Sequence, residues 1–156
     1  MNILTRESIK IDYPIINKML IELQNYHSKN IPTIYKKIDV FFTIDEYLKI
    51  LKDRNTFFLL AILNKEIVGL IWLRVNKKSS KYEYERKQIW IEGIYVETKY
   101  RRKGIAKFLL NETIKKAKIL NTKSIELMVW NFNEKSKKFF EKYFKVRALI
   151  MTMDNF

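Results

Sequence analysis

The sequence predicts a single α/β domain over residues 1–156, with a central mixed, mostly antiparallel sheet and helices on both of its faces. Three observations lead to this prediction. The chain of 156 residues is long enough to bury one core. Its apolar residues recur with strand spacing in some segments and with helical spacing in others, in the order β-α-α-β-β-β-α-β-α-β. Its longest apolar run, Thr56–Leu63, is as long as a strand and too short to span a membrane.

The N-terminal third is predicted to form one strand and two helices. Weak alternation of apolar and polar residues indicates a strand at Ile3–Ile9. Apolar residues then recur at helical spacing to about Ser28, with Asp12 as the N-cap and Pro14 in the first turn, where proline is tolerated. A second helix is expected at Thr43–Leu51, because this segment opens with a capping box.

The middle of the chain is predicted to form three strands. Thr56–Leu63 and Glu66–Val75 are apolar runs on either side of Asn64-Lys65, which is typical of a β-hairpin. The polar stretch Asn76–Lys87 is predicted to be a long exposed loop. A third strand is expected at Gln88–Val96, which is rich in β-branched and aromatic residues.

Two helices and two strands complete the prediction. One stripe of apolar residues indicates a helix at Arg102–Leu120, and a strand is expected at Ser124–Trp130. A short amphipathic helix at Asn133–Tyr143 and a closing strand at Val146–Met153 follow.

Composition and charge exclude several classes of protein. The absence of cysteine excludes disulfides, thiolate metal sites and cysteine nucleophiles, and no metal site is predicted. Met1–Lys10 lacks the apolar stretch of a signal peptide, so we expect a cytoplasmic protein with no membrane partner. The chain has 31 Lys plus Arg against 17 Asp plus Glu, a net charge of +14, which favours an anionic partner. Most of these lysines are expected to lie on solvated helix faces.

The stretch Tyr95–Ala106 has the pattern of an anion-binding turn. A strand ends there, a short basic turn follows, and a helix begins with Gly104 in its first turn. The N-terminus of a helix presents unpaired N–H groups and partial positive charge, and glycine lets an anion approach the backbone. This arrangement suits a phosphate or pyrophosphate. The spacings of the Walker loop and of G-x-G-x-x-G are both absent.

At this point the sequence resembles a known family. Arg101-Arg-Lys-Gly-Ile-Ala106 fits the Q/R-x-x-G-x-G/A pattern of the GNAT superfamily of N-acetyltransferases. The segment from Asn133 to Phe140 looks like the family's N-x-x-A-x-x-F-Y helix, and the flanking strands and helix are in the family's order. The resemblance is good over residues 88–146 and implies a GNAT-like fold.

The resemblance implies that acetyl-CoA binds in a V-shaped opening between the parallel strands Ile89–Val96 and Ser124–Trp130. The pyrophosphate would lie on main-chain amides of the basic turn, and the pantetheine arm would pair with the backbone of Tyr95 and Val96. Asn133 would hold the cofactor through its side chain, or would instead cap the following helix. The implied cofactor-binding residues are Tyr95, Val96, Arg101, Arg102, Lys103, Gly104, Ile105, Ala106, Asn133 and Phe140.

The resemblance also implies catalytic residues. An amine with a pKa of about 10.4 must lose a proton before it attacks the thioester, and the candidate base is Glu92, in the middle of an apolar strand. The alternative is a Glu that only faces solvent. The family often has a tyrosine as general acid where this chain has Phe140. Tyr143, Tyr95 or water would have to replace it. His27 and Trp90 are candidates for the acceptor site, although a structural role is the alternative for each.

Three functions remain open at this stage. The first is an N-acetyltransferase in which a primary amine, on a small molecule or on a protein or peptide, attacks acetyl-CoA directly in a ternary complex. The second is a non-catalytic acyl-CoA-binding module, which Phe140 makes credible. The third is a basic nucleic-acid-binding domain, which is disfavoured because most aromatic residues lie at core-periodic positions, so no nucleic-acid partner is expected. A monomer or a homodimer is expected, with pairing through Leu149–Met153 as one route.

Overall fold

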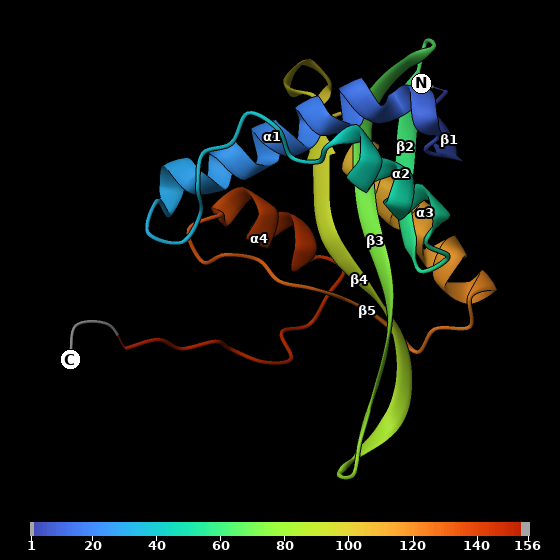
Figure 1. The fold of residues 1–156 in the computed structure, drawn as a ribbon. Helices are drawn as coiled ribbons and strands as arrows, with labels where there is room; N and C mark the ends of the chain where they lie inside the picture. The colour runs from blue at the N-terminus through green and yellow to red at the C-terminus, as the bar shows by residue number, and fades with distance from the viewer. Residues whose placement is uncertain (1, 154–156) are drawn as a thin grey trace.

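A computed structural model describes residues 2–153 of the chain (Figure 1). Its strands and helices are β1 (Leu4–Glu7), α1 (Tyr13–Asn30), α2 (Ile44–Lys52), β2 (Thr56–Leu63), β3 (Glu66–Ser80), β4 (Glu83–Val96), α3 (Ile105–Ile119), β5 (Ser124–Leu127) and α4 (Glu134–Phe140), with single 3-10 turns at Lys10–Asp12 and Thr98–Tyr100. Among the described residues, no helix has the length and apolar content needed to cross a membrane.

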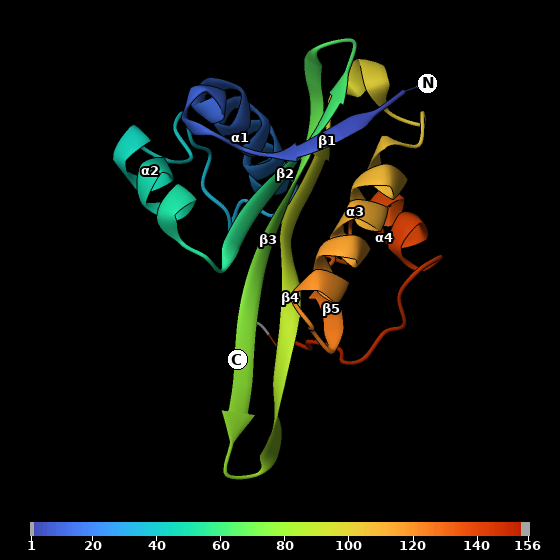
Figure 2. The ribbon, with the colours of Figure 1, turned by 90° about the vertical axis from the view of Figure 1, so that its right-hand side faces the viewer.

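The predicted mixed sheet is confirmed. Its strands lie in the order β1-β2-β3-β4-β5, every neighbouring pair is antiparallel except β4 and β5, and the sheet is open. Figure 2 shows α1 and α2 on one side of the sheet and α3 and α4 on the other. The prediction of helices on both faces is therefore also confirmed.

Each face of the sheet carries its own core. On one face, α1 and α2 bury Ile16, Met19 and Tyr47 against the strands, and on the other face α3 buries Leu109. Neighbouring residues of β2 point alternately into the two cores, so this strand is apolar at nearly every position. This explains why its sequence is a continuous apolar run.

The hairpin between β2 and β3 forms as predicted. Asn64 and Lys65 both have positive φ, 50° and 66°, which are the angles of a tight hairpin turn. The capping box at Thr43 is also confirmed, because its hydroxyl accepts a hydrogen bond from the N–H of Glu46 while the carboxylate of Glu46 accepts one from the N–H of Thr43.

The prediction of an exposed loop at Asn76–Lys87 is wrong. Strands β3 and β4 continue through this segment as a two-stranded ribbon, with Asn76 opposite Gln88 and Lys78 opposite Arg86. The ribbon projects beyond the helices (Figure 1). It buries little apolar surface, so its sequence lacks the alternation that indicates a half-buried strand.

The closing strand predicted at Val146–Met153 is also wrong. Residues 145–153 form no strand and run away from the body of the protein (Figure 1). A strand forms only where a neighbour pairs with its backbone, and the β-rich composition of this segment could not show that a neighbour is missing. The fold is therefore β-α-α-β-β-β-α-β-α.

Asp12 does not cap α1 through its side chain. Its carboxylate accepts hydrogen bonds from Arg6 at 2.6 and 2.8 Å and from the N–H of Ile9 at 2.8 Å. Burial of Asp12, which is only 4% exposed, opposes its ionisation. The hydrogen bonds from Arg6 and Ile9 outweigh this effect and hold the pKa of Asp12 below its usual value.

We predict that Asp12→Asn lowers the free energy of unfolding by about 1.5–3 kcal/mol near neutral pH, because a charged hydrogen-bond acceptor is lost. Since the folded-state pKa is depressed, this contribution is present above the unfolded pKa of about 3.9 and is lost as the pH falls through the lower folded value. Urea unfolding of both proteins across that range would measure it. If the two proteins differed in free energy of unfolding by the same amount at all pH values, the ionised carboxylate of Asp12 would not be the cause.

Candidate active site

The two parallel strands of the sheet pair over only four positions. Gln88 to Ile91 of β4 lie opposite Ser124 to Leu127 of β5, and β5 then ends while β4 continues to Val96. The chain after β5 leads to α4 rather than along β4. The end of β4 is therefore without a neighbour on this side among the described residues. The predicted separation of the two strands is present, although β5 ends three residues earlier than predicted.

A β-bulge lies where the two strands part. Leu73 of β3 is opposite Ile91 and Trp72 is opposite Gly93, so Glu92 is the extra residue. Ile89 and Ile91 before the bulge pack with α3, and so do Ile94 and Val96 after it. The bulge thereby moves Tyr95 to the face covered by α1, a change that the sequence does not indicate.

Glu92 forms an ion pair with Arg74, with 3.0 Å between Oε1 and Nε. The carboxylate side chain is 23% exposed. Trp90 lies directly opposite Arg74 on the neighbouring strand, so the three side chains are on the α1 side of the sheet. Arg74 was not singled out by the sequence, because it is 18 residues away from Glu92 and only the strand register brings them together.

Gly93, beside the bulge, has a clear packing reason. A Cβ at this position would be 2.9 Å from Cδ2 of Leu23 in α1. Glycine thus lets α1 lie close over the strand at the point where β4 and β5 separate.

The turn between β4 and α3 has the geometry of an anion site. Arg102 has a φ of 61° and Gly104 a φ of 81°, and Gly104 is the N-cap of α3 rather than a residue of its first turn as predicted. A Cβ at Gly104 would meet open space, so only the left-handed backbone requires glycine there. Arg101, Arg102 and Lys103 are exposed around it.

The N–H groups at this turn have no hydrogen-bond acceptor among the described residues. The first hydrogen bond of α3 runs from the N–H of Phe108 to the carbonyl of Gly104. The N–H groups of residues 102–106 donate no hydrogen bond to any described residue. Ile105 is buried and fixes the start of the helix, while Ala106 is partly exposed beside it.

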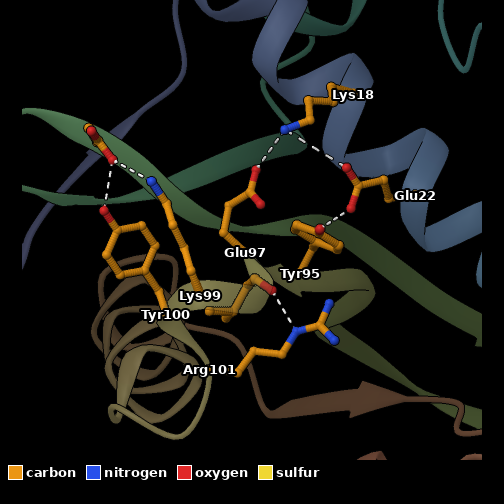
Figure 3. A network of polar contacts seen from close by, with 9 residues as sticks. Lys18, Glu22, Tyr95, Glu97, Lys99, Tyr100 and Arg101 are labelled. Atoms are coloured by element: carbon orange, nitrogen blue, oxygen red, sulfur yellow. Dashed lines mark hydrogen bonds and ion pairs between the residues drawn. The ribbon is translucent and has the colours of Figure 1, made fainter.

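A polar network joins α1 to the end of β4 (Figure 3). The hydroxyl of Tyr95 donates to Glu22, and Lys18 forms ion pairs with Glu22 at 3.9 Å and Glu97 at 3.2 Å. Burial, together with the hydrogen bond to Glu22, raises the pKa of the Tyr95 hydroxyl far above its usual value. This hydroxyl therefore stays protonated at neutral pH.

Arg101 bridges the basic turn and the end of β4. Its Nε donates to the carbonyl of Val96 at 2.9 Å, and its guanidinium lies 5.6 Å from the centre of the Tyr95 ring. The N–H of Glu97 donates a hydrogen bond to the carbonyl of Val68 in β3. Because the main-chain groups of successive residues in a strand point to opposite sides, those of Val96 point away from β3 and those of Tyr95 point toward it. The open edge near the turn is therefore formed by Val96 rather than by Tyr95.

The predicted residues of α4 have mainly structural positions. The side chain of Asn133 accepts a hydrogen bond from the N–H of Ser136 at 3.1 Å, which is an N-cap. Phe140 is buried between Phe139 and Phe144. Tyr143 lies beyond the end of α4, 45% exposed, with its ring against Phe139. Its hydroxyl bonds to no described residue.

His27 lies in an aromatic cluster formed by three segments that are distant in sequence. The centroid of its ring lies 5.2 Å from that of Tyr35 and 6.0 Å from that of Phe132. Its Nδ1 is 2.8 Å from the carbonyl oxygen of Leu23. Trp130 donates to the hydroxyl of Tyr35 at 2.8 Å. The cluster consists of Tyr26, His27, Tyr35, Trp130 and Phe132. Trp130 and Phe132 were not predicted as site residues.

The loop that supplies Tyr35 is held by asparagines of α1. Asn25 bonds to both main-chain groups of Ile38, and Asn17 accepts from the N–H groups of Phe41 and Phe42. Across the described residues, no group of three or more His, Asp or Glu side chains could hold a metal ion. The predicted site residues thus lie at the turn with unpaired N–H groups, at the ion-paired carboxylate of Glu92 and in the aromatic cluster around His27.

Comparison with known proteins identifies the family of the chain. Residues 20–145 match the model of the acetyltransferase (GNAT) family. This match covers most of the chain, and the protein therefore belongs to the GNAT acetyltransferase family. The resemblance that the basic turn and the α4 segment indicated is confirmed.

Solved structures have the same fold. A tetramutant of the BH1408 protein from Bacillus halodurans has a TM-score of 0.91 at 19% identity, over 97% of this chain and 99% of that chain. The aminoglycoside acetyltransferase AAC(6')-Iy, in complex with a CoA-linked bisubstrate analogue, has a TM-score of 0.76 at 13% identity, over 99% of both chains. A transcriptional regulator from Bacillus halodurans C-125 has a TM-score of 0.75 at 19% identity, over 99% and 100% of the two chains.

We predict that Tyr95→Phe lowers the free energy of unfolding by about 1 kcal/mol at neutral pH, because one hydrogen bond between α1 and β4 is lost. Since the folded-state pKa of Tyr95 is raised, its contribution is present below the unfolded pKa of about 10 and declines as the pH rises toward the folded value. Denaturant unfolding at neutral and alkaline pH would measure this. If the difference in the free energy of unfolding between wild type and Tyr95→Phe grew with pH, the hydrogen bond from Tyr95 to Glu22 would not be its cause.

Proposed function

We propose that the protein is an acetyl-CoA-dependent N-acetyltransferase in which a primary amine attacks the thioester directly in a ternary complex. One observation carries the proposal: the free N–H groups around Gly104 lie at the end of β4, where β4 has already separated from β5. Family membership supports acetyl transfer in general. The chemistry below is argued from the residues of this chain.

The turn fits the pyrophosphate of coenzyme A. The N–H groups of residues 102–106 are unpaired, the helix that follows contributes partial positive charge, and Gly104 leaves the approach open. Arg101, Arg102 and Lys103 add positive charge that is exposed to solvent. Ile105 and Ala106 would contribute main-chain donors. When bound, acetyl-CoA supplies an acetyl group activated as a thioester.

The open edge of β4 fits an extended amide-containing arm. Val96 has its main chain on this edge, and its carbonyl is held by Arg101. The main chain of Tyr95 would not pair with this arm. Its side chain would instead hold the site in place, since its ring contacts Arg101 and its hydroxyl bonds to Glu22 of α1. Asn133 uses its oxygen as an N-cap, which leaves its NH₂ group for the cofactor. Phe140 would support this region from the core.

Glu92 is the proposed proton acceptor for the attacking amine, directly or through a water molecule. It lies at the bulge where the strands part, and Arg74 orients its carboxylate. Trp90 on the same face would border the amine. A main-chain N–H at the end of β4 would stabilise the tetrahedral oxyanion.

The thiolate of coenzyme A either receives a proton from an acid in the site or leaves as the anion. Phe140 cannot donate one, and the hydroxyl of Tyr95 is engaged with Glu22 and is too weak an acid. The exposed hydroxyl of Tyr143 is the proposed acid. Water can replace it, because a thiol with a pKa of about 8.5 is an acceptable leaving group.

The acceptor is proposed to be a small-molecule amine. A solved neighbour is an aminoglycoside acetyltransferase with a bisubstrate analogue bound. In this chain the aromatic cluster with His27 lies beside the loop after α1 and would border the acceptor with ring faces, which attract a protonated amine. A peptide amine is the alternative acceptor.

A non-catalytic acyl-CoA-binding module is the second candidate function. Phe140 at the usual position of the acid, and a solved neighbour described as a transcriptional regulator, favour it. This module would bind the cofactor with the same turn but would release no free thiol with any amine.

We predict that Gly104→Ala weakens coenzyme A binding by about 1–3 kcal/mol, because a Cβ strains the left-handed backbone that aims the N–H groups. Isothermal titration calorimetry would measure the affinity. Lys107→Ala, an exposed alanine substitution on the same helix that leaves the backbone of the turn unstrained, is the control and is expected to weaken binding less. If both variants bind equally well, the turn does not hold the pyrophosphate.

We predict that Glu92→Gln lowers turnover by about 10²–10⁴-fold while the affinity for coenzyme A is unchanged. Release of free thiol from acetyl-CoA with a panel of amines and peptides would give the rates. Glu83→Gln is the matched control, because Glu83 also lies on β4 and forms an ion pair with an arginine, but at the tip of the ribbon. Cofactor binding without turnover in the wild type would favour the module, and no cofactor binding would refute both functions.

A further inference from the structure

Two carboxylates lie on the α1 side of the sheet where β4 and β5 pair and then separate, and each already has an arginine partner. Glu92 pairs with Arg74, with 3.0 Å between Oε1 and Nε. Glu126 is opposite Trp90 in the parallel register, so it faces the same side, and it pairs with Arg147. Among the described residues of β4 and β5, this part of the sheet therefore offers no uncompensated negative charge to a second ammonium group of an acceptor.

The guanidinium of Arg74 keeps an edge that faces solvent. Its ion pair with Glu92 is made through Nε, and within residues 2–153 it donates a hydrogen bond to no other residue. Asp53 interacts with the charge of Arg74, but its carboxylate accepts its hydrogen bonds from Thr56 at 2.7 Å and from the N–H of Asn55 at 2.9 Å. The two terminal nitrogens of a guanidinium match the two oxygens of a carboxylate. Because the Arg74 side chain is 48% exposed, a ligand can reach this edge.

We propose that the acceptor is a free α-amino acid, whose carboxylate binds the terminal nitrogens of Arg74 while its amino group lies against Glu92. This inference rests on the proposed acetyl transfer and names the class of its acceptor. The amino and carboxylate groups of an α-amino acid are attached to the same carbon, which fits two partners that are themselves in contact at 3.0 Å. One positive and one negative side chain, placed side by side, are complementary to a zwitterion.

The transfer to such an acceptor balances with the groups named. The ammonium form of the amino group gives one proton to Glu92, directly or through water, and the nitrogen lone pair then forms a bond to the acetyl carbon. The bond from that carbon to sulfur breaks, and its electron pair stays on the sulfur. A second proton of the nitrogen goes to the thiolate, and Glu92 releases its proton to solvent. The products are an N-acetyl amino acid and free coenzyme A, so Arg74 holds a group that the reaction does not consume.

The surroundings of Glu92 also indicate which side chain the amino acid carries. Leu23 of α1 lies against Gly93, the residue after Glu92, since a Cβ on Gly93 would be 2.9 Å from its Cδ2. His27 follows Leu23 by four residues, about 6 Å along the helix, and belongs to the aromatic cluster. An aromatic or large apolar side chain therefore fits beside the α-carbon, where it packs on Leu23 and the rings.

A matched pair of amines tests the inference in the wild-type protein. Phenylalanine and 2-phenylethylamine differ only in the carboxylate. Thiol release from acetyl-CoA is expected to have a kcat/KM about 10- to 100-fold higher for phenylalanine, the effect of losing a hydrogen bond to a charged group. Leucine and 3-methylbutylamine repeat the comparison with an aliphatic side chain, and 1,4-diaminobutane, with a second ammonium group, is expected to be the poorest acceptor. Equal rates within both pairs, or a preference for the diamine, would overturn the inference while acetyl transfer itself stands.

Arg74→Met is expected to remove the preference for phenylalanine over 2-phenylethylamine. The loss of the partner of Glu92 lowers both rates, but the ratio of the two rates cancels that common effect. Arg86→Met is the matched control, because Arg86 is a comparably exposed arginine on the same side of the sheet, four residues or about 13 Å before Trp90 on β4. The control is expected to keep the preference. A preference that survives in Arg74→Met would show that another group binds the carboxylate.

Calorimetry in the presence of coenzyme A separates this inference from the proposed function. Phenylalanine is expected to bind more tightly than 2-phenylethylamine, and Arg74→Met is expected to remove this difference with an unchanged circular dichroism spectrum. Binding of phenylalanine that depends on Arg74, without thiol release from any amine, would refute acetyl transfer and support the amino-acid site. If neither amino acid binds more tightly than its matched amine, the site is overturned, whichever amines are acetylated.

Discussion

One extra residue in β4, Glu92, determines how the two faces of the sheet meet at the candidate site. Without this bulge, the alternation of side chains would place Tyr95 on the side of α3, with Ile89 and Ile91. The bulge instead returns Ile94 and Val96 to that side and directs Tyr95 to α1. The same local irregularity lies where pairing with β5 ends, so the carboxylate of Glu92 and the start of the open edge of β4 are at the same point of the strand.

The residues around this point hold separate parts of the molecule together. Tyr95 and Glu22 join β4 to α1, and Arg101 joins the basic turn to the end of β4. Gly93 lets α1 approach the strand closely. The turn with the unpaired N–H groups at Gly104 is therefore tied to β4, the strand that carries Glu92. Preorganisation of this kind lets donors act without rearrangement of the protein.

Much of this fold was predictable because its signals are local. The capping box at Thr43, the hairpin turn at Asn64-Lys65 and the glycine of the basic turn each depend on a few adjacent residues. The ion pair of Glu92 with Arg74 and the aromatic cluster around His27 were not predictable, because strand register and helix packing bring these residues together. The C-terminal segment has the composition of a strand, but composition does not reveal whether a neighbour is present.

The ribbon formed by the outer halves of β3 and β4 has a different consequence. It is held by its own backbone ladder, and Tyr82 and Tyr84 near its tip are almost fully exposed. Its outer residues contribute little to either core, so its length and side chains can vary in evolution without altering the packing around Glu92. The ribbon is therefore a region where related proteins can acquire new surface contacts at little cost to folding.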